Sequence, residues 1–310
     1  MKVNIIVLNY NGMELLKECL PSIMEASKKT SHECRVTVLD NRSTDDSEAF
    51  IRKNFPEAVV YVAGSNRVFC SFNEIAGDVD DDILVLMNND IKVEPDFIDP
   101  LIGAFQAHED AFLAGPKCLM FDGKTYDGAK SKWWLEKGML KSGSRYEGYE
   151  AAIDKEGYTM QAGFGAFDRK KFIELGGFDD LYLPGIAEDM DLCYRAWKKG
   201  YKGYYEPRSL IYHIGQASFK KAFGSRKIME LAHRNTLLFM WKNMADARII
   251  LGHILWLPAR MVYSLLTGRI EFVSAFFKAL SRLSSALSRR RAQGPYKLTD
   301  REVLEISKGI

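Results

Sequence analysis

Residues 3–120 predict an α/β fold in which a mostly parallel sheet is flanked by helices. Short apolar runs alternate with amphipathic stretches along this part of the chain, and polar residues follow several of the apolar runs. Such alternation is typical of parallel sheets, whose strands are joined by helical crossovers. Ligands bind these sheets at the carboxyl ends of the strands. We therefore expect the polar residues after the strands to form a functional site.

Each element is predicted from its local pattern. The predicted strands are the apolar runs 3–8, 35–39, 58–62, 83–87 and 111–115. A helix between the first two is indicated by the spacing of Met13, Leu16, Leu20, Ile23 and Met24. Residues 43–46 favour the start of a short second helix. The acidic run 78–82 precedes a strand, at the opposite edge of the sheet, and we interpret it as a solvated turn.

The composition is that of a folded protein. Of the 310 residues, 47% are hydrophobic and 27% charged, which excludes wholesale disorder. Because 43 basic and 41 acidic residues nearly cancel, we expect no nucleic-acid partner. The 5 cysteines are widely spaced and fit a reducing, cytosolic compartment. No signal peptide is expected, because the first two residues run directly into an apolar strand.

Polar segments follow the first, second and fourth predicted strands. They read Asn9-Tyr10-Asn11, Asp40-Asn41-Arg42-Ser43 and Asn88-Asn89-Asp90. Neither G-x-G-x-x-G after the first strand nor a P-loop motif occurs, so phosphates must be held in another way. Asp90 at a strand end can bind a divalent cation that neutralises a diphosphate. The alternative is that this last segment only caps a turn, as Asn and Asp often do.

Two segments of the first half match motifs of a known family. Residues 7–11 read V-L-N-Y-N, and residues 40–47 read D-N-R-S-T-D-D-S. With these motifs, residues 2–245 resemble the family 2 inverting glycosyltransferases of the GT-A fold, particularly their rhamnosyltransferase-like branch. The resemblance implies that Asp40 hydrogen-bonds the base or ribose of a nucleotide sugar and that Asn9 and Tyr10 line the base pocket. The further donor-binding residues that it implies are Asn11, Asn41, Asn66, Asn73, Asn88 and Asn89.

The second half carries a longer match, which resembles the acceptor region of the same family. It comprises A-G-F-G-A-F at 162–167, G-G-F-D-D at 176–180 and E-D-M-D-L-C-Y-R at 188–195. The resemblance implies that Asp189 is the general base and that Asp191 and Arg195 brace its helix. For Asp191 and Arg195 we favour a plainer interpretation from their spacing alone, namely an ion pair within the helix. Such a pair stabilises a helix by a few tenths of a kcal/mol.

The resemblance also implies a metal site. Asn88-Asn89-Asp90 occupies the family's metal-binding position, so Asp90 is expected to be the principal ligand of Mg²⁺ or Mn²⁺. His213, six residues after Pro207, is expected to complete the site. A structural, hydrogen-bonded histidine is the alternative. The chain departs from the family pattern in the loop 66–73, which lacks the usual glycines, and in having one carboxylate in the segment 88–90.

Residues 246–310 predict a basic, amphipathic helical extension. The apolar run 249–266 is interrupted by His253, Pro258 and Arg260 and falls short of a clean membrane span. Residues 270–288 have one apolar helical face, and three arginines follow at 289–291. We expect this tail to bind an anionic membrane surface. The alternative is that its helices pack on the protein's own core.

These observations predict a GT-A glycosyltransferase domain at 1–245, with a nucleotide-sugar half at 1–120 and an acceptor half at 121–245. Residues 121–160 show no clear periodicity, and we expect a mobile loop over the cleft. The expected reaction is a metal-assisted single displacement that moves a hexosyl or deoxyhexosyl unit from a nucleotide-diphosphate sugar to a hydroxyl. The expected acceptor is a lipid-linked or surface oligosaccharide, and the expected location is the inner face of the cell membrane. The alternatives are a nucleotidyltransferase and a non-catalytic nucleotide-sugar-binding membrane scaffold.

Overall fold

The computed structural model describes residues 1–161, 163–215 and 217–310. Its main sheet is ten-stranded, in the order β10-β12-β6-β11-β4-β1-β2-β3, with β5 beside β12 and β7 beside β6. The strands of this sheet are β1 (Lys2–Asn9), β2 (Glu33–Asp40), β3 (Val59–Val62), β4 (Ile83–Asn88), β5 (Ile91–Val93), β6 (Ala111–Met120), β7 (Tyr126–Gly128), β10 (Gly157–Tyr158), β11 (Gly165–Asp168) and β12 (Lys202–His213). A separate hairpin comprises β8 (Lys132–Glu136) and β9 (Met139–Gly143).

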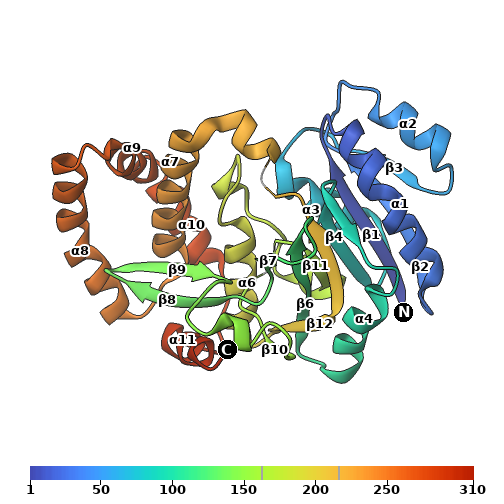
Figure 1. The fold of residues 1–310 in the computed structure, drawn as a ribbon. Coiled ribbons are helices and arrows are strands. Elements are labelled where there is room, and N and C mark those ends of the chain that lie inside the picture. The colour runs from blue at the N-terminus through green and yellow to red at the C-terminus, as the bar shows by residue number, and fades with distance from the viewer. Residues whose placement is uncertain (162, 216) are drawn as a thin grey trace.

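Helices surround this sheet and continue beyond it as a helical region (Figure 1). The α-helices are α1 (Met13–Lys29), α2 (Ser47–Asn54), α3 (Phe72–Asp78), α4 (Ile98–Ala107), α5 (Arg169–Glu174), α6 (Glu188–Lys198), α7 (Ala217–Asn243), α8 (Ala247–Leu266), α9 (Ile270–Leu280), α10 (Leu283–Ala292) and α11 (Asp300–Lys308). Short 3₁₀ helices are η1 (Val68–Ser71), η2 (Tyr149–Ala151) and η3 (Asp180–Tyr182). The predicted α/β class and the C-terminal helices are therefore confirmed.

Strand directions place several carboxyl ends at one edge of the sheet. β1 pairs in parallel with β2 and β4, and β6 pairs in parallel with β12. β11 runs antiparallel between β4 and β6, so these two neighbours of β11 point the same way. The five predicted strands correspond to β1, β2, β3, β4 and β6. The residues that follow them consequently meet at the edge where ligands are expected.

Two expectations about local segments are wrong. Residues 121–160 contain β7, the β8–β9 hairpin, η2 and β10. Trp133 in this segment is buried and packs on Tyr194 of α6, with ring centroids 5.1 Å apart. The acidic run 78–82 is not wholly solvated, because Asp81 is buried and accepts hydrogen bonds from Asn4 and Arg35. In both segments the partners come from distant parts of the chain, which local periodicity does not reveal.

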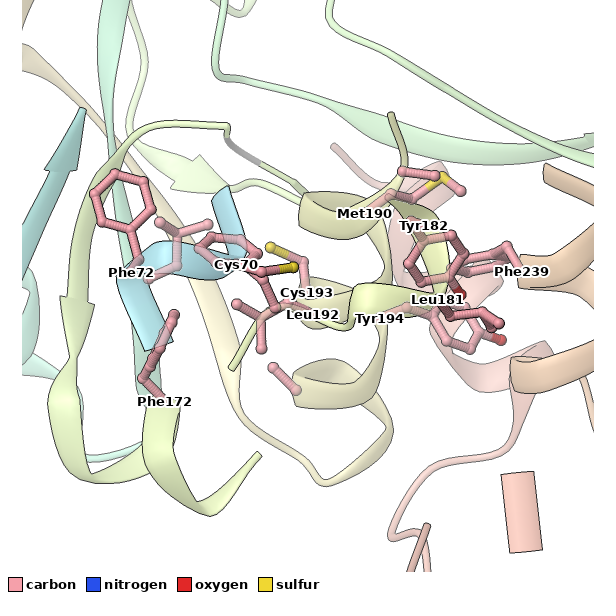
Figure 2. Packing of buried hydrophobic residues seen from close by; sticks show 14 of the residues in the cluster. Cys70, Phe72, Phe172, Leu181, Tyr182, Met190, Leu192, Cys193, Tyr194 and Phe239 are labelled. Carbon is pink, nitrogen blue, oxygen red and sulfur yellow. The ribbon is translucent and has the colours of Figure 1, made fainter. Parts of the chain in front are cut away.

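Helix α6 is fixed by apolar packing on two sides (Figure 2). Leu192 and Cys193 lie toward Cys70 of η1, and Tyr194 lies toward Phe239 of α7. The Tyr194 and Phe239 rings meet edge to face, with centroids 5.2 Å apart. The start of α6, which carries the predicted base, is therefore held by the core.

Asp191 does much more than form a pair along its own helix. Its carboxylate is fully buried and bonded to Arg195 at 2.7 Å and to Lys242 at 2.7 Å and 2.8 Å. The Tyr182 hydroxyl and the Asn243 amide also donate to it, each at 2.7 Å. Burial raises the pKa of Asp191, but the positive charges outweigh burial and hold it well below its usual range. The expected ion pair with Arg195 is present, and the structure adds Lys242, Tyr182 and Asn243 as further partners of Asp191.

The C-terminal helices share the core with α6 and α7. Ala286 and Val303 are fully buried, and Asp300 accepts hydrogen bonds from Tyr194 and Lys198. The expected boundary at 245 is thus not a break in packing. Residues 270–288 form two helices, and Phe272, Ala275 and Ala279 of the first are buried. These helices pack on the protein's own core, but through residues other than the predicted apolar face, of which Phe277 and Leu280 are exposed.

The arginines at 289–291 are partly engaged within the protein. Arg289 forms ion pairs with Asp179 and Asp180, and Arg290 donates to the Trp241 carbonyl at 3.4 Å. Arg291 is exposed. Arg289 and Arg290 therefore bind groups within the protein, so the cluster as a whole does not face lipid head groups as expected.

We predict that Lys242→Met lowers the free energy of unfolding by about 3 kcal/mol, because a buried carboxylate loses one of its cations. Urea unfolding followed by circular dichroism measures this loss. The control is Lys199→Met, which removes a partly exposed ion pair with Glu174. That change should cost about 1 kcal/mol or less. Equal, small losses for both variants would contradict the central role of the Asp191 network.

Candidate active site

Asn9 joins the polar ends of three neighbouring strands. Asn9 lies opposite Asp40 where β1 pairs with β2. Its neighbour Leu8 lies opposite Asn88 where β1 pairs with β4. The Asn9 amide donates to Asp40 Oδ1 at 3.2 Å and accepts from Asn89 Nδ2 at 2.7 Å. Because Asn9 is fully buried, it acts as a brace beneath this edge. The predicted convergence of the strand ends is confirmed.

Gly12 leaves room for this brace. A Cβ atom at position 12 would lie 2.0 Å from Asn89 Nδ2 and 2.8 Å from Asn9 Oδ1. Contacts that short do not occur between non-bonded atoms, so any side chain here would push the two amides apart. Steric contact with these amides thus explains why a glycine follows the Asn9-Tyr10-Asn11 segment, which the sequence alone did not reveal.

The other residues of the first two motifs lie around the same edge. Asp40 is buried and accepts from the Ser43 backbone at 2.9 Å, while Asn11 accepts from the Thr44 backbone at 2.6 Å. Asn41 is buried, and its Oδ1 has no hydrogen-bond partner among the described residues. Tyr10 is 53% exposed. A ligand at this edge would therefore meet the exposed Tyr10 ring, whereas the unsatisfied Asn41 oxygen is buried.

The loop 66–73 is held by its own side chains. Asn66 accepts from the Val68 backbone at 3.1 Å. Asn73 exchanges two hydrogen bonds of 2.8 Å with the Phe178 backbone, so its amide fixes the segment after Gly177. Val68 has φ of +51°, a conformation that β-branched residues rarely adopt. Donor contacts of Asn66 and Asn73, like those of half-buried Asn88, stay predictions.

A second group of polar residues lies at the ends of β4, β7 and β12. Asp90 is buried, and its Oδ1 lacks a hydrogen-bond partner in the described part of the chain. His213 Nε2 lies 3.4 Å from this oxygen, and His213 Nδ1 lies 2.8 Å from Asp127 Oδ2. The structure thus brings the two predicted metal ligands together and adds Asp127 beside them.

The donor set around Asp90 fits a divalent cation. An ionised carboxylate only accepts hydrogen bonds, so His213 Nδ1 carries the proton toward Asp127, and neutral His213 presents a lone pair at Nε2. Ligands of a small octahedral cation lie roughly 3 Å apart, which is close to the separation found here. Burial lowers the pKa of His213, but the two neighbouring carboxylates, Asp127 and Asp90, outweigh burial and raise it to about 9. Metal binding would therefore release a proton.

Cys118 lies close to Asp127 and His213 and could in principle complete a different metal site. Its thiol is buried, and burial raises the pKa of Cys118 far above that of a free thiol. A protonated thiol is a poor metal ligand. The unsatisfied oxygen of Asp90 makes the space between Asp90 and His213 the better candidate.

Asp189 opens α6, as the sequence predicted. Its Oδ2 accepts from Gln161 Nε2 at 2.8 Å, and a Cβ atom at Gly163 would lie 3.5 Å from that oxygen. Burial raises the pKa of Asp189, which makes it a stronger base than an exposed carboxylate. Ala162, from the same predicted motif, lies outside the described residues. Asp189 therefore has the electrostatic setting that a general base requires.

Glu188 precedes half-buried Asp189 and is itself buried, with Oε2 unpartnered among the described residues. Burial and the neighbouring Asp189 raise the pKa of Glu188 to about 8. Two adjacent carboxyls in an apolar setting cannot both ionise readily. A neutral Glu188 would leave the negative charge on Asp189.

Sequence reasoning missed Asp127 and Gln161. Asp127 lies in β7, which returns to the carboxyl end of β6, and Gln161 directly precedes the A-G-F-G-A-F motif. Neither belongs to a quoted motif, and each is recognisable only from the atom it contacts. A strand prediction within 121–160 would have placed Asp127 near the strand ends.

Comparisons with known proteins agree with this geometry. The profile of Glycosyl transferase family 2 matches residues 4–176. A curated protein named for polypeptide N-acetylgalactosaminyltransferase 10, from Drosophila melanogaster, is 25% identical over 174 residues. The match covers 53% of this chain and 26% of the relative's length. This chain therefore corresponds to a minor part of that protein.

Solved structures show the same fold at low sequence identity. GalNAc-T7 with UDP, GalNAc and Mn²⁺ has a TM-score of 0.60 at 14% identity, covering 80% of this chain and 48% of that chain. TarS residues 1–349 from S. aureus gives 0.56 at 13% identity and covers 100% and 91%. The mannosyltransferase PcManGT of Pyrobaculum calidifontis, with GDP-Man and Mn²⁺, gives 0.53 at 16% identity and covers 94% and 75%.

These likenesses confirm the predicted GT-A type of fold, while the rhamnosyltransferase-like branch stays a prediction. The family profile covers more than half of the chain and includes all three polar strand ends. The chain belongs to glycosyl transferase family 2.

Proposed function

We propose that this chain is an inverting glycosyltransferase that moves a hexosyl or deoxyhexosyl unit from a nucleotide-diphosphate sugar to an acceptor hydroxyl. One observation carries the proposal, namely the different environments of two acidic sites. Asp189 is placed beside neutral Gln161, whereas Asp90 faces His213 at the strand ends. The first setting suits a base and the second suits a cation beside a diphosphate.

The donor would lie along the edge built by Asn9, Asp40 and Asn89. Tyr10 and Asn41 would contact the nucleoside, since Tyr10 is exposed and the Asn41 oxygen lacks a partner among the described residues. Two of the similar structures hold nucleotide or nucleotide-sugar ligands together with Mn²⁺. These ligands belong to those proteins and support a nucleotide sugar as the donor class here.

Asp90 and His213 would hold Mg²⁺ or Mn²⁺, and Asp127 would orient the imidazole. When bound, the cation stabilises the negative charge that develops on the departing diphosphate. Asn88 and Asn89 supply neutral oxygens, so Asp90 provides the formal negative charge of the segment 88–90. The fit rests on the unsatisfied Asp90 oxygen and on the imidazole nitrogen beside it.

Asp189 would take the proton of the acceptor hydroxyl as that oxygen attacks the anomeric carbon. Attack from the face opposite the diphosphate inverts the configuration in one displacement. Gln161 would hold the carboxylate in place, and Gly163 keeps the space beside it open. We propose a lipid-linked or surface glycan as acceptor and the inner membrane face as location, supported by the exposed apolar side chains of α8.

We predict that Asp189→Asn reduces turnover by about 10²–10⁴-fold while nucleotide-sugar affinity is retained, because the base is lost and the donor edge is intact. Donor consumption with acceptor measures turnover, and calorimetry measures donor binding. The control is Asp168→Asn, since Asp168 is also an acid at a helix N-terminus, that of α5. Wild-type turnover in Asp189→Asn would refute the assignment and direct attention to Glu188.

We predict that Asp127→Ala weakens Mn²⁺ binding by about 10–100-fold, because the imidazole loses the carboxylate that fixes its tautomer and orientation. Calorimetric titration with Mn²⁺ in the presence of UDP or GDP measures the change. Asp154→Ala serves as control, since Asp154 is an exposed acid that pairs with Lys117. An unchanged Mn²⁺ titration in Asp127→Ala would return Asp127 and His213 to a structural role.

A further inference from the structure

Helix α8 exposes a continuous apolar face. The helix is 20 residues long. An 18-residue stretch of it has a mean hydropathy of 1.5, and only 17% of that stretch is buried. Several exposed apolar residues recur at helical spacing along one face, namely Leu251, Ile254, Leu255, Val262, Leu265 and Leu266. Leu255 is 68% exposed and Leu266 is 83% exposed. Contiguous apolar surface of this kind marks an interaction site on a folded protein.

The opposite face of α8 is docked on the protein. His253 is buried and accepts from Trp241 Nε1 at 3.0 Å, and its other ring nitrogen lies 2.8 Å from the Gly138 carbonyl. Arg260 donates to two backbone carbonyls of the β8–β9 hairpin, each at 3.0 Å. These bonds fix the orientation of the helix. Crossing a bilayer would leave the polar groups of His253 and Arg260 without these partners.

Gly138 makes this docking close. A Cβ atom on it would lie 2.9 Å from the Gly252 carbonyl and 2.9 Å from Trp256 Cβ. Gly138 also has φ of +73°, which favours glycine. The hairpin tip therefore touches the backbone of α8, as its approach to α8 in Figure 1 also indicates. The docked face and the exposed face of α8 are set by this contact.

Neighbouring elements also carry exposed apolar side chains. Helix α9, which contacts α8, exposes Phe277 and Leu280 by 59% and 44%. Trp134 and Leu135 of β8 are 39% and 40% exposed and line a cavity together with Trp256 of α8. Tryptophans at the margin of an apolar surface are typical of the boundary between lipid and water.

Positive charges flank the exposed face. Arg248 and Arg269 are exposed near the two ends of α8, and the helix itself contains no Asp or Glu. Arginines beside an apolar helical face complement anionic head groups above an acyl region.

We propose that α8 lies in the plane of an anionic membrane surface, with its exposed apolar face among the acyl chains and the hairpin-docked face on the protein. The proposal moves the membrane contact from the arginines at 289–291 to Arg248, Arg269 and the apolar face between them. It refines the membrane location in the proposed function and does not depend on the transfer chemistry. The catalytic domain would then remain beside the head groups where a lipid-linked acceptor is accessible.

The test is sedimentation of the full chain with vesicles of phosphatidylglycerol and with vesicles of phosphatidylcholine. Leu255→Glu should weaken partitioning into phosphatidylglycerol vesicles by about tenfold or more, because a charge would replace a leucine that lies among the acyl chains. The matched control is Ile173→Glu, which changes an exposed apolar residue on α5 and should bind as the wild type does. Equal binding of Leu255→Glu and wild type would overturn the proposal.

The charged part of the contact has its own variant. Arg248→Gln combined with Arg269→Gln should reduce the preference for phosphatidylglycerol over phosphatidylcholine by about fivefold or more. An unchanged preference would remove these arginines from the proposal. Circular dichroism of each variant establishes that the fold is retained, and donor hydrolysis without vesicles measures the catalytic site separately. Absence of donor hydrolysis in the wild type and in the variants would count against the proposed function and leave the membrane proposal standing.

Two other arrangements give different results. A spanning helix would keep the protein on vesicles after alkaline carbonate extraction, whereas an in-plane helix is released. Docking of a second copy on α8 would give a dimer without lipid that Leu255→Glu dissociates, together with no binding to vesicles. Either result would overturn the in-plane arrangement. Release by carbonate and a monomer without lipid would support it.

Discussion

The buried charge of Asp191 is the constraint on which the arrangement of the second half depends. A carboxylate without solvent needs cations and hydrogen-bond donors, and these come from α6, α7 and the segment before α6. Lys242 also binds Asp179, which in turn pairs with Arg289 of α10. The same set of charges therefore joins α6 and the segment before it to the C-terminal helices. A chain with an apolar residue at position 191 would have no need of these connections.

The position of Asp189 follows from this constraint. It precedes Asp191 by two residues in the first turn of α6, so its backbone is fixed by the network and by the apolar packing of the helix. Asp191 is surrounded by positive charge, which lowers its pKa, while Asp189 contacts neutral Gln161 and burial raises its pKa. Two nearby carboxylates thereby acquire different protonation behaviour from their surroundings, which is how acids and bases are distinguished in many active sites.

The sequence predicted those parts of the fold whose signals are local. The five strands, the first helix and the meeting of Asn9, Asp40 and Asn89 all follow from apolar runs and from the polar residues after them. The β8–β9 hairpin and the pairing of Asp127 with His213 were missed, since their partners are distant in sequence. The helical pattern at 270–288 was recognised, but which side faced the core depended on α7 and could not be read from periodicity.

Val68 holds a strained backbone conformation in the loop 66–73, which lacks the glycines of the resembling motif. Its positive φ costs about 1–3 kcal/mol. The conformation is held from outside, because Asn41 donates to the Val68 carbonyl at 3.3 Å and Arg67 forms an ion pair with Asp180. Asp180 also binds Arg289, so the loop 66–73 is tied to the same charges that surround Asp191. These contacts therefore hold the strained backbone of Val68 in place, and under the proposed function we expect its branched side chain to influence donor selectivity.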